Sequence, residues 1–279
     1  MHTWSGICRG VEIGPHELDL GREANERYWR SAGLDAPILA AGAAYPMIAA
    51  NCTVLAWLAS CNEPMIQTRQ HLVCHGRLAT PARLATTGVV ADRFERRGRD
   101  YVTVRVDITD SDGNLIWTSE VDFTPAKTIT TSARSDASAD TAAARLGRDE
   151  VTDGVIDGAN DVGAAVVERR TLTITDDLIR RYSRRGNYHS EAQTASNLGL
   201  PGLVAQGTQV CGPAYATLLD AWGERFVERG SFDARFVAMV LGGDTVEAAV
   251  IVRDTEATFT VHNRTRGKVA ATGRAACGA

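Results

Sequence analysis

The same succession of hydrophobic and polar patterns occurs twice along the chain. Residues 101–108 alternate with a period of two, Asp112-Gly113 predicts a hairpin turn, and residues 115–123 form the returning strand. Residues 258–262 and 268–276 repeat this pattern around a turn near Gly267. Before each strand region, a mostly apolar segment predicts a helix of about four turns or more, ending near Ala59 and near Phe226. An apolar helix followed by a meander favours an antiparallel sheet wrapped around the helix.

The two helical segments are also related in sequence. Residues 46–53 (PMIAANCT) align with residues 201–208 (PGLVAQGT), and Tyr28 and Tyr182 lie upstream of them at corresponding places. In the second segment, Pro213 lacks a backbone donor and predicts a kink or a late helix start.

A change of composition separates the two repeats. Residues 128–163 are rich in Ser, Thr, Ala, Asp and Gly and contain no aromatic residue, which is typical of a linker. We therefore expect an N-terminal unit of residues 1–127, a linker of residues 128–163, and a C-terminal unit of residues 164–279. The length of 279 residues suits two such units.

Charge and hydropathy argue against a nucleic-acid-binding protein and against a membrane protein. The formal net charge of −4 gives no general attraction to nucleic acid or to an anionic membrane surface. Polar residues interrupt the longest apolar stretches, so they predict no membrane span. The first residues lack the apolar core of a signal peptide, so we expect a cytoplasmic protein.

The segment from Tyr182 to Thr208, YSRRGNYHSEAQTASNLGLPGLVAQGT, holds the clearest candidate chemistry. Here the chain resembles the MaoC-like family of (R)-specific enoyl hydratases and dehydratases. The family signature has an aromatic residue, then Gly-Asp-x-Asn-Pro-x-His, a small residue, and a Gly-rich apolar turn that opens the central helix. The positions that fit this signature are Tyr182, Gly186, Asn187, His189, Ala195 and Gly207.

The resemblance implies an α+β double hotdog fold. In this fold each of two hotdog units has a long central helix wrapped by an antiparallel sheet, and the units pack as a pseudo-dimer. The first half has no His after Tyr28. We therefore expect one active site per chain, at the seam between the halves, with the space in the first half holding the acyl chain.

The resemblance also implies a lyase that adds or removes water beta to the carbonyl of an acyl thioester. No metal or redox cofactor is needed for this reaction. The expected partner is an acyl-CoA or acyl-carrier-protein substrate, and a homodimer is the assembly considered.

The active-site motif departs from the family pattern, because the Asp and the Pro are missing and the motif is contracted to Gly-Asn-Tyr-His. In the family, Asp and His together hold the water that adds across the double bond. Two alternatives therefore stay open. The first is another reaction of a biosynthetic pathway, such as isomerisation, conjugate addition or cyclisation. The second is a non-catalytic hotdog protein that binds an acyl ligand.

Three residues carry the expected chemistry. His189 is the candidate base, because the ordinary pKa of histidine lies near neutrality. The amide of Gly207, at a helix start, suits the negative charge that develops on the thioester oxygen, and the missing side chain lets the carbonyl approach. Asn187 orients His189 or a water molecule.

Five further residues are candidates for substrate binding: Tyr188, Glu191, Gln206, Arg184 and Arg185. The two arginines would contact CoA phosphates or an acidic carrier protein. Glu191 has a second interpretation, as the carboxylate at a helix N-terminus.

Overall fold

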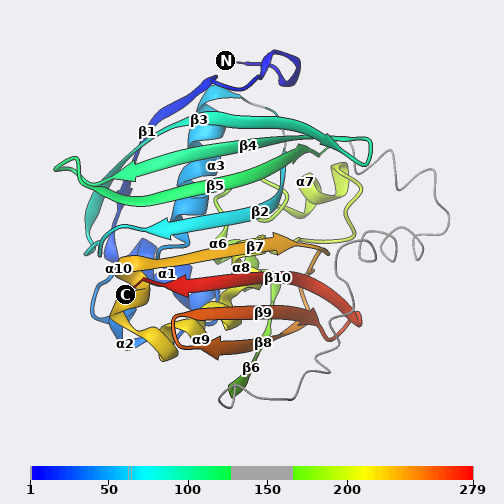
Figure 1. The fold of residues 1–279 in the computed structure, drawn as a ribbon. Coiled ribbons are helices and arrows are strands. Elements are labelled where there is room, and N and C mark those ends of the chain that lie inside the picture. Colours follow the sequence, from blue (N-terminus) through cyan, green and yellow to red (C-terminus); the bar gives the residue numbers. More distant parts are fainter. Residues whose placement is uncertain (1, 62, 64, 127–165, 279) are drawn as a thin grey trace.

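A computed structural model describes residues 2–61, 63, 65–126 and 166–278 (Figure 1). The expected linker, residues 128–163, lies outside the described residues. Ten antiparallel strands form one continuous sheet, in the order β1-β3-β4-β5-β2-β7-β10-β9-β8-β6. From one edge the order is β1-β3-β4-β5-β2, and from the other edge it is β6-β8-β9-β10-β7. The two orders are the same when each of β1–β5 is replaced by the strand numbered five higher. The sheet therefore consists of two halves of equal topology, joined between β2 and β7.

The strands of the first half are β1 (Glu12–Leu20), β2 (Met65–Cys74), β3 (Ala82–Arg96), β4 (Arg99–Thr109) and β5 (Leu115–Pro125). Those of the second half are β6 (Val166–Thr173), β7 (Gly230–Phe236), β8 (Thr245–Arg253), β9 (Glu256–Asn263) and β10 (Lys268–Cys277). Both predicted hairpins are confirmed. Gly113 has φ of +83° in the β4–β5 turn, and Gly267 has φ of +64° in the β9–β10 turn.

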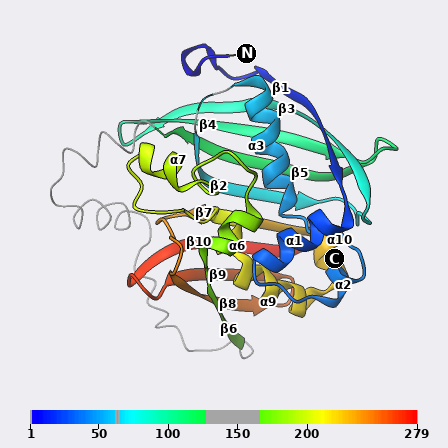
Figure 2. The same cartoon turned by 180° about the vertical axis from the view of Figure 1, so that it is seen from behind.

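The helices lie on one face of the sheet (Figure 2). They are α1 (Arg22–Ser31), α2 (Pro37–Ala40), α3 (Ile48–Ser60), α6 (Asp176–Tyr182), α7 (Ala192–Asn197), α8 (Gly207–Val210), α9 (Gly212–Trp222) and α10 (Glu224–Arg229). A 3-10 turn, η1 (Trp4–Gly6), precedes β1. Among the described helices, none has both the length and the apolar composition needed to cross a bilayer.

The central helix of the first half is α3, and the strands wrap around it as the sequence predicts. It packs against β1, β3, β4 and β5. Its 13 residues are apolar on nearly every side, and Trp57 and Ile48 are each 1% exposed. Burial of large apolar side chains of this kind stabilises a fold by about 1.5–3 kcal/mol each.

The central helix of the second half is broken into three pieces, so the prediction of one helix ending near Phe226 is wrong. α8 ends at Val210, and α9 begins at Gly212 with Pro213 in its first turn, where the missing N–H removes no helical hydrogen bond. The predicted effect of Pro213 is therefore confirmed. Gly223, with φ of +55°, ends α9 after 11 residues, and α10 follows in a new direction.

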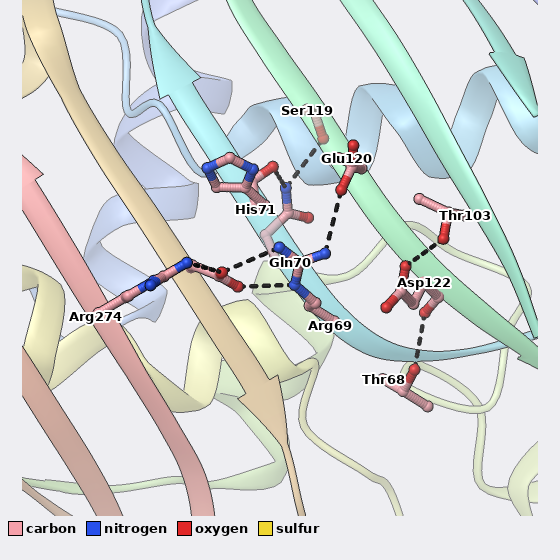
Figure 3. Close-up of polar contacts among 10 residues, drawn as sticks. Thr68, Arg69, Gln70, His71, Thr103, Ser119, Glu120, Asp122 and Arg274 are labelled. Carbon is pink, nitrogen blue, oxygen red and sulfur yellow. Dashed lines mark hydrogen bonds and ion pairs between the residues drawn. The ribbon is translucent and has the colours of Figure 1, made fainter. Parts of the chain in front are cut away.

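The seam between the halves is held on the outer face of the sheet by charged side chains (Figure 3). Residues 69–73 of β2 pair with residues 231–235 of β7. The Arg69 guanidinium donates from Nε and Nη2 to the two carboxylate oxygens of Asp233, at 2.9 and 3.0 Å, and from Nη1 to Glu120 at 3.1 Å. Arg274 of β10 approaches Asp233 from the other side.

On the inner face, the seam is closed by α1, α6, α8 and the start of α9. The rings of Tyr28 and Tyr182, which correspond in the repeat, meet edge to face at 5.6 Å. Gln209 of α8 donates to the carbonyl oxygens of Ser31 and Leu178. Gly212 packs directly on the backbone of Ala32, since a Cβ at this glycine would lie 1.9 Å from the Ala32 oxygen.

Candidate active site

A cavity of about 570 Å³ lies at the seam, and both halves line it. The first half contributes one face of α3, the start of β2 and parts of β4 and β5. The second half contributes the loop that carries His189, the helix α7, the start of α8 and the segment after β7. The cavity is therefore located where the sequence predicts a site, with His189 in its wall.

The loop that carries His189 is shaped by Asn187. The side-chain Oδ1 of Asn187 accepts from the backbone N–H of His189 at 2.9 Å and from that of Ser190 at 3.2 Å. Its carbonyl oxygen accepts from the N–H of Ser190 and of Glu191. This side-chain turn fixes the backbone on both sides of His189. Asn187 thus orients His189 through the main chain rather than through the imidazole.

The imidazole is held by a backbone carbonyl. Nδ1 of His189 lies 2.5 Å from the carbonyl oxygen of Val204, which can only accept, so Nδ1 carries the proton. Nε2 is then the unprotonated nitrogen, and it has no hydrogen-bond partner among the described residues. Val204 is itself fixed by a β-bridge to Leu241, and the adjacent Ala205 N–H donates to Val240. The protein therefore selects the tautomer in which Nε2 is a proton acceptor.

The surroundings of His189 keep it neutral. Burial lowers the pKa of the imidazole to about 4; the carbonyl of Val204 opposes this shift and the Arg184 guanidinium adds to it. The ring of Tyr188 packs on the imidazole, with centroids 4.0 Å apart. Tyr188 also joins the two halves, because its hydroxyl lies 3.4 Å from the Met65 carbonyl of β2. Burial raises the pKa of Tyr188 to about 12.

Gly207 is the first residue of α8, and the preceding Gln206 is its N-cap. Both line the cavity, and Gln206 donates to the Ser183 hydroxyl at 3.3 Å. The amide of Gly207 makes no hydrogen bond within the described part of the chain. A Cβ at Gly207 would lie 2.5 Å from the ring of Phe236. The packing against Phe236 therefore accounts for a glycine at this position without any ligand.

Two of the predicted substrate-binding residues do not reach the cavity. Glu191 is exposed, forms the N-cap of α7 and accepts from the Thr194 hydroxyl, which agrees with its interpretation as a helix-end carboxylate. Arg185 is exposed and outside the cavity wall, whereas the neighbouring Arg184 lines it. Arg185 directly before the motif and Glu191 shortly after it are both exposed.

Other parts of the wall were not singled out from the sequence as binding residues. Tyr28, Asn51 and Met65 come from the first half, and the repeat itself was the signal, because Asn51 aligns with Gln206. The Val204 carbonyl could not be predicted from the sequence, because every residue has a backbone carbonyl and nothing marks this one. Within the described residues, no group of three or more His, Cys, Asp or Glu could hold a metal ion.

Comparison with protein families gives a match in the second half. Residues 157–274 match the family model described as the MaoC like domain. The match includes His189 and Gly207, so the C-terminal half is similar to this family around the candidate site. A comparison with curated proteins gave no match.

Solved structures share the fold over nearly the whole chain. The full-length peroxisomal multifunctional enzyme type 2 from Drosophila melanogaster matches with a TM-score of 0.71 and 14% identity, over 96% of this chain and 48% of that one. This chain thus spans about half the length of that enzyme. A MaoC-like dehydratase from Phytophthora capsici matches with a TM-score of 0.70 and 12% identity, over 98% and 96% of the two chains.

A conserved hypothetical protein from Mycobacterium tuberculosis, described as having a double hotdog fold, matches with a TM-score of 0.63 and 14% identity, over 98% and 97% of the chains. At sequence identities this low, the structural similarity establishes the fold and nothing about the function. The chain has the α+β double hotdog fold that its sequence predicts.

Proposed function

We propose that this chain is a hydro-lyase that adds or removes water beta to the carbonyl of an acyl thioester, with His189 as its base. The observation that carries the proposal is the Val204 carbonyl on Nδ1, which leaves Nε2 as a proton acceptor in the wall of a large, mostly apolar cavity. The similarity to the MaoC-like domain around His189 supports the same class of reaction.

A single histidine is sufficient for the proton transfers of dehydration. Nε2 of His189 takes the α-proton of a 3-hydroxyacyl thioester, and the amide of Gly207 donates to the oxygen that becomes negative. The electron pair of the enolate forms the double bond as the β-hydroxyl leaves. The imidazolium returns its proton to that hydroxyl, which departs as water. Hydration is the reverse, and the low pKa of His189 makes its imidazolium a strong acid for this step.

A second candidate is isomerisation of an enoyl thioester, and one observation favours it. Among the described residues that line the cavity, Glu63 is the only carboxylate, and it accepts from the backbone N–H of Trp4. The Asp of the family motif thus has no counterpart beside His189. Moving a proton between the α and γ carbons needs one base and the same amide, with no water to be positioned.

One assay separates these candidates. The chain is incubated with enoyl and 3-hydroxyacyl thioesters of CoA, and the products are followed by absorbance of the conjugated thioester and by intact mass. Hydration changes the mass by one water, and isomerisation changes the absorbance at constant mass. If no thioester in the panel is altered, the proposal of an acyl-thioester enzyme is wrong.

The pH dependence of the rate provides a further test. The base works only when neutral, so activity should be retained on the acidic side of neutrality and fall as pH drops through about 4, where His189 becomes protonated. An unperturbed histidine would instead lose activity near pH 6.5. The measurement is kcat/KM against pH, with circular dichroism confirming that the fold persists at each acidic point.

The Arg184 guanidinium helps to lower this pKa, so Arg184→Gln should move the acidic limb of kcat/KM to higher pH. Arg185→Gln is the matched control, because Arg185 is outside the cavity wall and does not contribute to the pKa of His189. An equal displacement of the limb in both variants would contradict a local effect of Arg184.

A further inference from the structure

The first half forms its part of the cavity wall with one face of α3. Val54, Leu55 and Leu58 make this face apolar, and Asn51, one turn earlier, is a polar residue among them. An acyl chain without oxygen needs only the apolar residues. The proposed reaction alone therefore does not explain why the side-chain amide of Asn51 lies in this wall.

The Nδ2 of Asn51 is buried and has no partner at ordinary hydrogen-bond geometry among the described residues. Asn51 lines the cavity, so its amide borders the space that a ligand would occupy. Tyr28 of α1 lines the cavity beside it. Burial raises the pKa of the Tyr28 hydroxyl, and hydrogen bonding with the Asn51 side chain opposes that rise, which places the two groups next to each other.

No described residue other than Asn51 pairs with the Tyr28 hydroxyl. Two adjacent polar groups therefore border one cavity, and neither has a partner outside this pair. Unpaired polar groups in a mostly apolar wall weaken binding of an apolar ligand and favour a ligand that pairs them.

We infer that Asn51 and Tyr28 form a subsite for a hydroxyl group on the acyl chain, beyond the reacting carbons. A hydroxyl fits both partners, because it donates to Oδ1 of Asn51 and accepts from the Tyr28 hydroxyl. The inference rests on the proposed function and names its substrate class, a hydroxylated acyl thioester.

The position of the subsite agrees with this role. The ring of Tyr28 packs on that of Tyr182, whose hydroxyl donates to Thr208 at 3.1 Å, next to Gly207. The subsite thus lies across the seam from the amide that would hold the thioester oxygen. The acyl chain would extend from His189 and Gly207 in the second half to Asn51 in the first.

The two groups are uncharged, which favours a neutral hydroxyl over a carboxylate. Arg27 lies over the Tyr28 ring, with its guanidinium carbon 5.8 Å from the centroid, but it does not line the cavity. A buried carboxylate would need a cation or several donors at this place.

The test uses ligands that cannot react, so its result does not depend on turnover. Pantetheine thioethers with a plain alkyl chain, and with chains of equal length bearing one hydroxyl at each position beyond the third carbon, are titrated by calorimetry. We expect one hydroxylated analogue to bind about 10-fold more tightly than the alkyl analogue. Asn51→Leu, which keeps the size of the side chain, should reduce this ratio to about one, and Tyr28→Phe should reduce it in part.

Asn197→Leu is the matched control. Asn197 is an asparagine of the same cavity wall, but its Oδ1 already accepts from Gln193 at 2.9 Å. This variant should keep the preference for the hydroxylated analogue. Thermal unfolding of each variant shows whether it is folded. If Asn51→Leu is not folded, the binding ratio of Tyr28→Phe tests the subsite instead.

The outcomes separate this inference from the proposed function. Equal affinity of the unaltered chain for all analogues, or an unchanged ratio in Asn51→Leu, overturns the subsite, for example because Asn51 and Tyr28 hold only a water molecule. A hydroxyl preference without turnover of any thioester supports the subsite and removes the proposed hydro-lyase activity. Absence of binding by every analogue overturns both.

Discussion

Replacing His189 by alanine should lower kcat for the thioester reaction by about 100- to 10,000-fold, the usual contribution of a general base. The substitution removes the only imidazole in the cavity wall within the described residues. It also frees the Val204 carbonyl, which a water molecule can satisfy because the position reaches the cavity. Steady-state kinetics measures the loss, and circular dichroism and thermal unfolding establish that the fold remains.

Glu191→Gln is the matched control for His189→Ala. Glu191 lies in the same segment, but it is exposed and occupies the N-cap position of α7, outside the cavity wall. Its substitution should change kcat less than 10-fold, because no proton transfer depends on it. A His189→Ala variant with unaltered kcat would end the proposal that His189 is the base and would favour a protein that only binds its acyl ligand.

Replacing Gly212 by alanine should lower the free energy of unfolding by about 2–3 kcal/mol, as expected when a methyl group is forced into a packed site. The added Cβ would lie 1.9 Å from the carbonyl oxygen of Ala32, and a backbone atom at a helix end cannot move aside as a flexible side chain can. The gain in helix propensity on replacing glycine, about 1 kcal/mol, does not offset this clash. Urea unfolding measures the change.

Gly202→Ala is the matched control for Gly212→Ala. A Cβ at Gly202 would meet no atom within 4 Å, and its backbone does not have a positive φ. Its free energy of unfolding should change by less than about 0.5 kcal/mol. If the two variants are equally stable, α9 and α1 are not in the close contact described across the seam.

Much of the fold follows from local pattern. Period-two alternation and the glycines at 113 and 267 predict the hairpins, because a positive φ at a tight turn is easily adopted only by glycine. Pro213 predicts the break between α8 and α9. The break at Gly223 was missed, because a glycine within an apolar segment is compatible with a continuous helix until the packing of the following segment is known.

The candidate site was predictable only as far as its residues are contiguous in sequence. The segment 186–189 indicates the base, and the repeat indicates where the second helix begins. The Val204 carbonyl that fixes the tautomer is a backbone group placed by a bridge to Leu241, and no residue type marks such a group. Arg184 lines the cavity and Arg185 does not, and this difference depends on the exact turn, which composition does not determine.

Because the two hotdog halves are joined in one chain, their sequences can evolve independently. In a symmetric dimer of identical units, every substitution appears in both copies of each wall, so a change that admits a new acyl group also alters the residues around the base. Here α3 and the loop of His189 are encoded separately although they face one cavity. Mutational libraries confined to the cavity face of α3 should therefore alter which acyl groups are accepted while the proton-transfer residues remain constant.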